Sequence, residues 1–230
     1  KISIMASLVL KTLIKLKNPF EFIFFTKKII FLFLTKIFCK RKKYAMAGGL
    51  RQIKNLKKIK LNKIIMANSF DYTTFLSSKQ KKMKKLNKYI LFLEAPTPIF
   101  PGDELVYKGE SYEGTTKKNW VPSLNNFFNE IEKIFKCKVK IAAHPKVKHK
   151  KNPKYYDGRE ILNKPLFKTA YNAKFLISVW STGHSYAVMY NKPSLFIKSK
   201  EMTNQSFLTS QKTFSQSIGS EIINIDEKIE

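Results

Sequence analysis

Short apolar runs alternate with helical patterns from residue 89 to the end of the chain, and no other sequence feature constrains the fold as strongly. The apolar runs predict strands at 89–93, 138–145, 175–177 and up to Ile197, and a last strand or edge segment at 219–226. Apolar spacing predicts helices at 124–135, near 159–171 and around 187–189. Because a helix separates each strand from the next, this order predicts an α/β fold with a parallel sheet wrapped by helices.

The segment 175–197 has the pattern of a strand, a turn, a short helix and a second strand. Ser181, Thr182 and Gly183 supply caps and a tight turn, and residues 191–193 end the helix. Unpaired backbone amides and the positive end of a helix coincide at such a turn, so the segment predicts an anion site. Ordinary N-capping, which satisfies the same amides without a ligand, is the alternative.

A His-Pro pair, His144 and Pro145, follows the apolar positions Val139, Ile141 and Ala142. A histidine at the carboxyl end of a parallel strand lies on the edge where open α/β sheets bind ligands, and it can donate a hydrogen bond to a phosphate. A surface-loop histidine is the alternative. Because the turn at 181–183 follows in the next strand and helix unit, we favour a ligand-binding role for His144 over a surface-loop histidine.

The 230-residue chain carries a formal charge of +28, which is concentrated in its N-terminal part. Residues 1–90 hold 23 lysines and arginines against two acidic residues, a net charge of +21. Only three basic residues of the whole chain are arginines, although bidentate contacts to phosphates and bases usually use arginine. We therefore expect no specific nucleic-acid partner, and we keep peripheral contact with anionic membrane as a hypothesis.

The two cysteines, Cys39 and Cys137, belong to no motif, and the sequence has no zinc-ligand spacing. A reduced, cytoplasmic protein without a metal site is the simplest interpretation. The hydrophobic content of 43% predicts a globular chain with a sizeable core.

Two apolar stretches, 2–16 and 20–38, precede the alternating pattern. The second is long enough to cross a bilayer, but Lys27 and Lys28 lie near its middle, where each costs about 2.5 to 3.5 kcal/mol. We therefore expect buried strands or an interfacial segment there, and no secretory signal. The chain begins with Lys1, which suggests a fragment or a processed product.

A lysine-rich region with its own strand and helix pattern precedes residue 86. The pattern predicts a strand and glycine turn at 44–49, a helix at 50–60, a strand at 63–67, a loop at 68–72 and a solvated helix or linker at 79–88. The predicted organisation is a partial N-terminal region at 1–85 and a C-terminal domain at 86–230.

Five segments carry a family resemblance through their order and spacing. They are IIMANSFDYTTFL at 64–76, YILFLEAPTPIFPGDE at 89–104, LNNFFNEIE at 124–132, KIAAHPK at 140–146, and the segment 175–197. They resemble bacterial GT-B-type glycosyltransferases of capsule and lipopolysaccharide synthesis, in the sialyltransferase-like and Kdo-transferase-like groups that carry a His-Pro motif. The resemblance extends from about Ile64 to Asp226.

The resemblance implies a two-domain enzyme with Rossmann-like halves, of which this chain has the C-terminal half and a truncated, acceptor-side N-terminal half. It implies a nucleotide-sugar donor without a further cofactor, and a polysaccharide or lipid-linked acceptor at the inner face of the plasma membrane. His144, followed by Pro145, would bind the donor phosphate, and Ser181, Thr182 and Gly183 would cradle the phosphate or nucleotide. The remaining candidates for the donor site are Ser178 and Ser185.

An inverting transferase also needs a carboxylate that takes the proton of the acceptor hydroxyl. Asp103 and Glu104, on the loop after the strand at 89–93, are the first candidates, and two solvated loop acids are the alternative. Glu94 is a third option, and Asp71 is the option in the N-terminal region.

Two other classes of function stay open. The lysine-rich half predicts a non-catalytic module that binds nucleic acid or anionic membrane, with a steep salt dependence. A nucleotide-sugar epimerase would share the fold and the phosphate turn. The sequence has no clear Asp-X-Asp pair, which argues against a donor bridged by a metal ion.

Overall fold

The computed structural model describes residues 26–27, 30–31, 34, 44–57, 61–79, 88–95, 115–145, 147, 149 and 154–227. The chain divides into two compact units, with the boundary between Ala67 and Asn68. The predicted assignment of 1–85 and 86–230 to acceptor and donor domains stays a prediction.

The first unit contains a small parallel sheet of two strands. Strands β1 (Tyr44–Ala47) and β2 (Lys63–Met66) pair side by side, and helix α3 (Leu50–Leu56) connects them. The predictions of a strand before the glycine turn, a helix and a second strand are confirmed.

The predicted apolar segments 2–16 and 20–38 lie almost entirely outside the described residues. Within the second segment, Thr26, Lys27, Ile30, Phe31 and Leu34 are helical and exposed, so these five positions are not in buried strands. Among the helices that the structure describes, none combines the length and the apolar character needed to span a bilayer.

The second unit begins with helix α4 (Phe70–Lys79), where the sequence predicts a loop at 68–72. The loop prediction is confirmed for Asn68 and Ser69 and is wrong from Phe70, because the Ser69 hydroxyl accepts the Tyr72 N–H at 3.2 Å as a helix cap does. The predicted linker at 79–88 falls mostly on residues outside those described.

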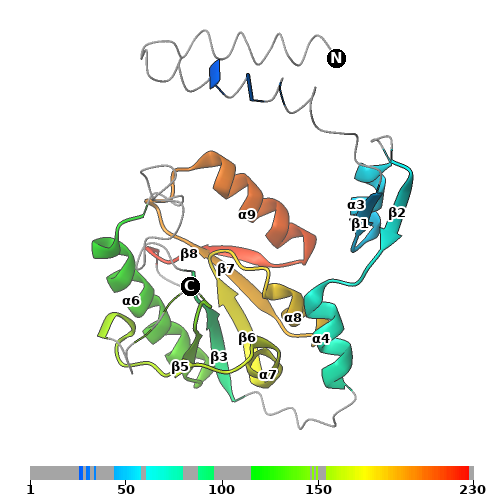
Figure 1. Cartoon of the computed structure of the whole chain (residues 1–230). Coiled ribbons are helices and arrows are strands. Elements are labelled where there is room, and N and C mark those ends of the chain that lie inside the picture. Colours follow the sequence, from blue (N-terminus) through cyan, green and yellow to red (C-terminus); the bar gives the residue numbers. More distant parts are fainter. Residues whose placement is uncertain are drawn as a thin grey trace. The chain divides into compact units, whose positions relative to one another are not determined.

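A six-stranded parallel sheet forms the centre of this unit (Figure 1). The strands are β3 (Tyr89–Leu93), β4 (Val139–Ala142), β5 (Ile161–Leu162), β6 (Ala173–Ser178), β7 (Ser194–Lys198) and β8 (Glu221–Asn224). Their order across the sheet is β5-β4-β3-β6-β7-β8. The chain thus winds from the centre to one edge, returns to the centre and winds to the other edge, which is the doubly wound Rossmann arrangement. The predicted α/β, Rossmann-like sheet is confirmed.

Helices cover both faces of the sheet. Helices α6 (Lys117–Phe135) and α9 (Gln205–Ser217) pack on the face that carries Ile90 and Phe92. Helices α7 (Leu166–Asn172) and α8 (His184–Met189) pack on the opposite face, against Leu91 and Leu93. Because side chains alternate along β3, its successive apolar residues supply both cores.

The structure adds elements that the sequence pattern does not predict. The helix expected near 159–171 begins only at Leu166, because Ile161–Leu162 form strand β5. A 3₁₀ turn, η1, occupies Lys154–Tyr156. Helix α9 is unpredicted because polar Gln211 and Ser215 share its buried side with Phe207, which weakens the apolar period.

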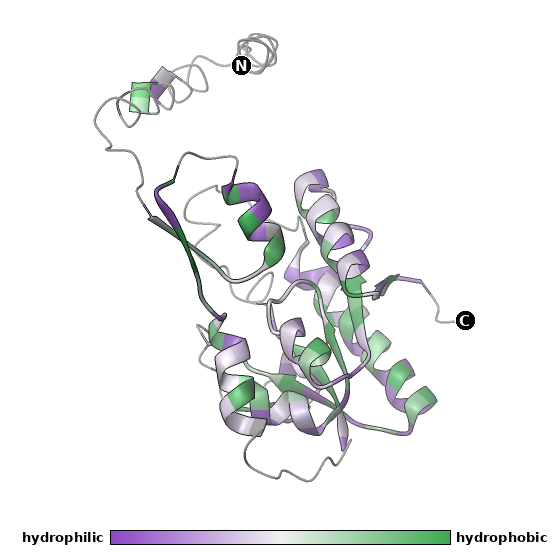
Figure 2. Ribbon diagram, turned by 90° about the vertical axis from the view of Figure 1, so that its right-hand side faces the viewer, coloured by the Kyte–Doolittle hydropathy of each residue, from purple (hydrophilic) through white to green (hydrophobic). Residues whose placement is uncertain are grey.

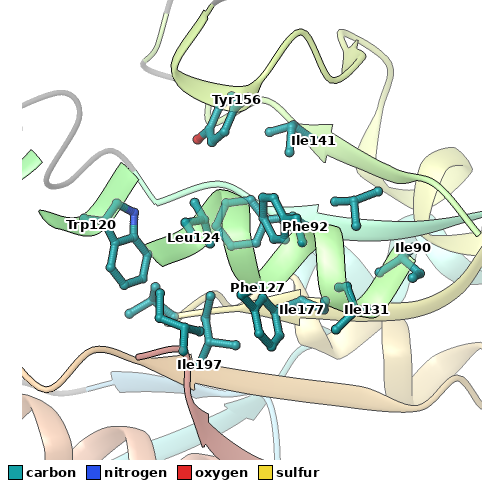
Figure 3. Close-up of a cluster of buried hydrophobic side chains, with 14 of the residues drawn as sticks. Ile90, Phe92, Trp120, Leu124, Phe127, Ile131, Ile141, Tyr156, Ile177 and Ile197 are labelled. Atoms are coloured by element: carbon teal, nitrogen blue, oxygen red, sulfur yellow. The ribbon is translucent and has the colours of Figure 1, made fainter. Parts of the chain in front are cut away.

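The larger core lies between the sheet and α6. Figure 3 shows this cluster, in which Phe92 of β3 lies close to Leu124 and Phe127 of α6. The Phe92 and Phe128 rings meet edge to face with centroids 5.1 Å apart. Figure 2 shows the strands mostly in green, the colour of hydrophobic residues, as expected for a sheet buried on both faces.

Arg159, just after η1, forms hydrogen bonds with three residues of helix α6. Its guanidinium group donates hydrogen bonds to Asn125 Oδ1 at 3.0 Å, Asn129 Oδ1 at 2.6 Å and Glu132 Oε1 at 3.2 Å. Burial raises the pKa of Glu132, but the hydrogen bond from the Val139 N–H and the Arg159 charge outweigh it, so this pKa lies below its ordinary value. The nearly buried Arg159 therefore joins α6, β4 and the η1 segment in one polar network.

We expect Arg159→Ala to lower the free energy of unfolding by about 3 kcal/mol, because it removes three charge-assisted hydrogen bonds to Asn125, Asn129 and Glu132 from a nearly buried position. Urea denaturation followed by circular dichroism measures this loss. Lys138→Ala is the matched control, since Lys138 Nζ contacts the same Glu132 from an exposed position at 3.4 Å and contributes only about 0.5 kcal/mol. Equal losses in the two variants would contradict the role given to Arg159.

Candidate functional site

The carboxyl ends of β3 and β6 meet at the point where the winding of the sheet reverses. Strand β3 has β4 on one side and β6 on the other. The connection after β3 leads to α6 on one face of the sheet, and the connection after β6 leads to α8 on the opposite face. Open α/β sheets bind their ligands at such a reversal. The residues that follow β3, β4 and β6 are therefore the candidate site.

Glu94 follows β3 directly, and its side chain is completely buried. Three donors converge on its carboxyl group: the His144 N–H at 2.9 Å, His149 Nε2 at 2.6 Å and the Tyr156 hydroxyl at 2.7 Å. A buried carboxylate requires such partners, because an unpaired one costs several kcal/mol. Glu94 thus ties together the ends of β3 and β4, residue 149 and η1.

His149 connects Glu94 to Tyr155. While Nε2 of the buried imidazole faces Glu94, Nδ1 makes a hydrogen bond with the Tyr155 hydroxyl. Burial, and then the negative charge of Glu94, raise the pKa of Tyr155 to about 12. Glu94, His149 and Tyr155 therefore form a continuous hydrogen-bonded chain, in which the half-buried tyrosine keeps its phenol proton at neutral pH.

The two tyrosines of η1 are held in place from helix α6. Asn125 Nδ2 donates to the Tyr155 carbonyl oxygen at 3.0 Å, and the Arg159 guanidinium group approaches the Tyr156 carbonyl oxygen at 3.4 Å. Burial, followed by the charge and hydrogen bond of Glu94, raises the pKa of Tyr156 well above its ordinary value. The phenol of Tyr156 consequently stays a donor to Glu94.

The predicted phosphate turn at 181–183 follows β6, and its amides are bonded within the turn. The Gly183 N–H donates to Ser181 Oγ at 3.1 Å, and the His184 and Ser185 N–H groups donate to the carbonyl oxygens of Ser181 and Thr182. These three amides are therefore paired within the turn, one with the Ser181 hydroxyl and two with backbone carbonyl oxygens, while helix α8 has no side-chain cap. The hydroxyl protons of Ser181 and Thr182 remain as donors that a ligand can use.

Gly183 lies close to two leucine side chains. A Cβ atom at this position would lie 2.6 Å from Leu166 Cδ2 and 3.1 Å from Leu93 Cδ1. The turn after β6 therefore lies directly against the last residue of β3, so it adjoins the strand end from which Glu94 extends.

Ser178 and His184 form a buried pair beneath the turn. Ser178 Oγ and His184 Nε2 are 2.7 Å apart, and the imidazole stacks on the Phe196 ring at 4.3 Å. Burial lowers the pKa of His184 to about 4, and its Nδ1 has no hydrogen-bond partner among the described residues. Because neither side chain is exposed, this pair supports the turn from below and does not face a ligand.

Two further sequence candidates, Asp71 and Ser185, contact each other. The Ser185 hydroxyl donates to Asp71 Oδ2 at 2.9 Å, which joins α4 to α8. Burial, and then the Asp71 charge, raise the pKa of the neighbouring Tyr186 to about 12. This arrangement gives Asp71 a role in holding α4 on the sheet unit.

The structure places His144 and Pro145 after β4, on the same edge as Glu94, with the His144 backbone fixed by that carboxylate. The candidate bases Asp103 and Glu104 lie outside the described residues. Of the residues the structure does describe, no three His, Cys, Asp or Glu side chains are grouped as metal ligands would be.

The sequence prediction did not identify His149, Tyr155, Tyr156 or His184 as residues of this edge. One signal was present for the tyrosines, because two adjacent aromatic residues in a lysine-rich loop are unusual for a solvated segment. His149 gave no signal, since its partner Glu94 is 55 positions away in the chain.

Comparisons with known proteins find no matching family model and no match among curated proteins. Among solved structures, the UDP-GlcNAc 2-epimerase of Methanocaldococcus jannaschii, in complex with UDP-GlcNAc and UDP, is similar with a TM-score of 0.48 and 13% identity over 80% of this chain. The chain spans about half of that epimerase, 51% of its length. KpsC of Thermosulfurimonas dismutans, a β-Kdo 2,7-transferase, is similar with a TM-score of 0.32 and 11% identity, covering 72% of this chain and 67% of that one. The fold assignment rests on the strand order of this chain itself.

We expect His184 to make stability depend on pH between about 6.5 and 4. The unfolded chain binds a proton near pH 6.5, whereas the folded pKa is about 4, so the folded state loses stability as the pH falls through this window. The loss reaches about 3 kcal/mol at pH 4. Urea denaturation at several pH values should show a shallower dependence for His184→Gln, which keeps a hydrogen-bonding group near Ser178. Parallel pH dependences would contradict burial of a neutral imidazole.

Proposed function

We propose that the six-stranded unit is the nucleotide-sugar-binding half of a GT-B-type glycosyltransferase, which transfers a sugar to a surface polysaccharide or lipid-linked acceptor. The observation that carries the proposal is the polar group at the reversal of a Rossmann sheet, where Glu94, His144 and His149 meet beside the turn at 181–183. The sequence resemblance supplies the chemistry of sugar transfer. The strand order supports a nucleotide site at this reversal of the sheet.

The proposed donor site lies between the His-Pro segment and the turn after β6. His144 would donate a hydrogen bond from its imidazole to the donor phosphate, and Glu94 fixes the backbone from which that imidazole extends. Because the amides of the turn are paired internally, Ser181 and Thr182 would contribute their hydroxyl protons. Gly183 lies close to the Leu93 side chain, so the turn adjoins the end of β3 from which Glu94 extends.

The proposed base for the acceptor hydroxyl remains Asp103 or Glu104. The two other carboxylates considered are engaged elsewhere, since Glu94 accepts three hydrogen bonds and Asp71 accepts one from Ser185. Contact of the lysine-rich region with anionic membrane is part of the same proposal, because the charge of residues 1–90 would favour anionic lipid near a lipid-linked acceptor.

Calorimetry with CMP and UDP nucleotides tests the donor site. We expect one of the two nucleotides to bind, and we expect His144→Ala to weaken that binding about tenfold or more, because it removes a hydrogen bond to a charged phosphate. Thr182→Val should weaken binding severalfold, whereas Thr209→Val, on the exposed side of α9, serves as the matched control. Failure of both nucleotides to bind, or unchanged binding by His144→Ala, would show that the donor site is wrong.

Further outcomes separate the other classes of function. Proton NMR of UDP-GlcNAc incubated with the chain would reveal inversion at the sugar C2 if the chain is an epimerase. A gel-shift and liposome-flotation series with increasing salt would reveal a basic binding module, whose retention falls steeply with salt and is insensitive to His144→Ala.

A further inference from the structure

Trp180 stands directly before the turn at 181–183, and its side chain is exposed to the extent of 38%. Among the residues of the six-stranded unit that the structure describes, the other exposed large apolar side chains lie on helices α4, α6 and α8. We propose that the indole of Trp180 stacks on the base of the bound nucleotide. This inference rests on the proposed donor site and adds to it the residue that holds the base.

The indole of Trp180 is held in place by helix α9. Its ring centroid lies 6.1 Å from that of Phe207 and 5.6 Å from that of Phe214. Gln211, on the same helix, donates from Nε2 to the Val179 carbonyl oxygen at 2.6 Å. Because this carbonyl belongs to the peptide bond that leads into Trp180, helix α9 fixes both the backbone and the ring of the tryptophan.

A row of aromatic rings connects the two residues that flank the turn. Phe214 also meets Phe196 of β7 edge to face, with centroids 5.7 Å apart, and Phe196 stacks on the His184 imidazole at 4.3 Å. The row therefore runs from Trp180 before the turn to His184 after it, and Phe196 and His184 are completely buried. A ring that is fixed by packing and still exposed is a preorganised flat surface, which loses little conformational freedom when it binds a ligand.

The place of Trp180 in the chain suits the base of a nucleotide. The hydroxyl groups of Ser181 and Thr182 are the proposed phosphate donors, and the Cα atoms of consecutive residues are about 3.8 Å apart. Since one ribose joins the phosphate to the base, a phosphate at these hydroxyl groups leaves the base within reach of the preceding indole. Every nucleobase has a π face that can stack on an aromatic ring. Trp180 therefore contributes affinity for the nucleotide without selecting cytosine or uracil.

Calorimetry measures the contribution of the indole. The probes are whichever of CMP and UDP the unaltered chain binds, and the matching nucleotide-sugar, CMP-sialic acid or UDP-GlcNAc. We expect Trp180→Leu to weaken nucleotide binding about fivefold or more, because the aromatic face is lost while an apolar side chain remains against α9. Trp180→Phe keeps an aromatic face and should stay within about threefold of the unaltered chain. The loss should be equal for the nucleotide and the nucleotide-sugar, since both carry the same base.

Phe135→Leu is the matched control. Phe135 is 41% exposed, and its ring packs on buried Phe175 with centroids 4.9 Å apart, much as Trp180 packs on α9. It is the last residue of α6, however, and so lies near the amino end of β4, at the opposite edge of the sheet. Loss of this ring should leave nucleotide binding unchanged, and thermal denaturation checks that every variant is folded.

Tryptophan fluorescence reports the contact directly, because the chain has two tryptophans and the other, Trp120, is buried. In Trp120→Phe, bound nucleotide should change the emission of Trp180 and protect it from quenching by acrylamide. Ribose 5-phosphate, which has the ribose and the phosphate without a base, should do neither. If Trp120→Phe does not fold, the unaltered chain gives the same comparison, since acrylamide quenches an exposed indole before a buried one.

Several results would overturn the stacking. These are a loss of less than about fivefold in Trp180→Leu, equal losses in Trp180→Leu and Trp180→Phe or in Phe135→Leu, and a loss confined to the nucleotide-sugar. Equal protection of Trp180 by ribose 5-phosphate and by the nucleotide would also overturn it. Any of these results, together with nucleotide binding that depends on His144, leaves the proposed function intact. If the unaltered chain binds neither CMP nor UDP, the proposed function fails and the stacking fails with it.

Discussion

The buried carboxylate of Glu94 is the interaction on which this edge of the sheet depends. It lies at the end of the central strand β3 and accepts hydrogen bonds from His144, His149 and Tyr156, which all follow β4 in the stretch 144–156. Removing any one donor would leave this buried carboxyl group with one partner fewer, at a cost of about 1 to 3 kcal/mol. The three hydrogen bonds therefore hold the end of β3, the end of β4, residue 149 and η1 in fixed positions relative to one another.

Helix α6 extends that rigidity from the core to the site. Its apolar side packs on β3 and β4, and its polar residues Asn125, Asn129 and Glu132 bind Arg159. Since Arg159 follows η1 closely, the packing of α6 also determines where Tyr155 and Tyr156 lie. A contact that stabilises the fold thus also sets the geometry of the candidate site.

The strands of the sheet could be predicted from the sequence, but the residues that meet at the candidate site could not. The buried strands β3, β6 and β7 are continuous apolar runs, so their existence and parallel arrangement could be predicted. Strand β5 has two residues and helix α9 buries Gln211, so neither has a clear apolar period. The partners of Glu94 could not be predicted, because they are brought together by the sheet and by no sequence motif.

The doubly wound order has a kinetic consequence for this unit. Strands β3 and β6 are neighbours at the centre, yet Tyr89 pairs with Ala173, and α6, β4, β5 and α7 all lie between them in the chain. Closing so long a stretch costs entropy before the pairing stabilises it, so contacts of this kind slow folding. The reversal of the sheet is consequently assembled by the strand pairing with the longest sequence separation in the sheet.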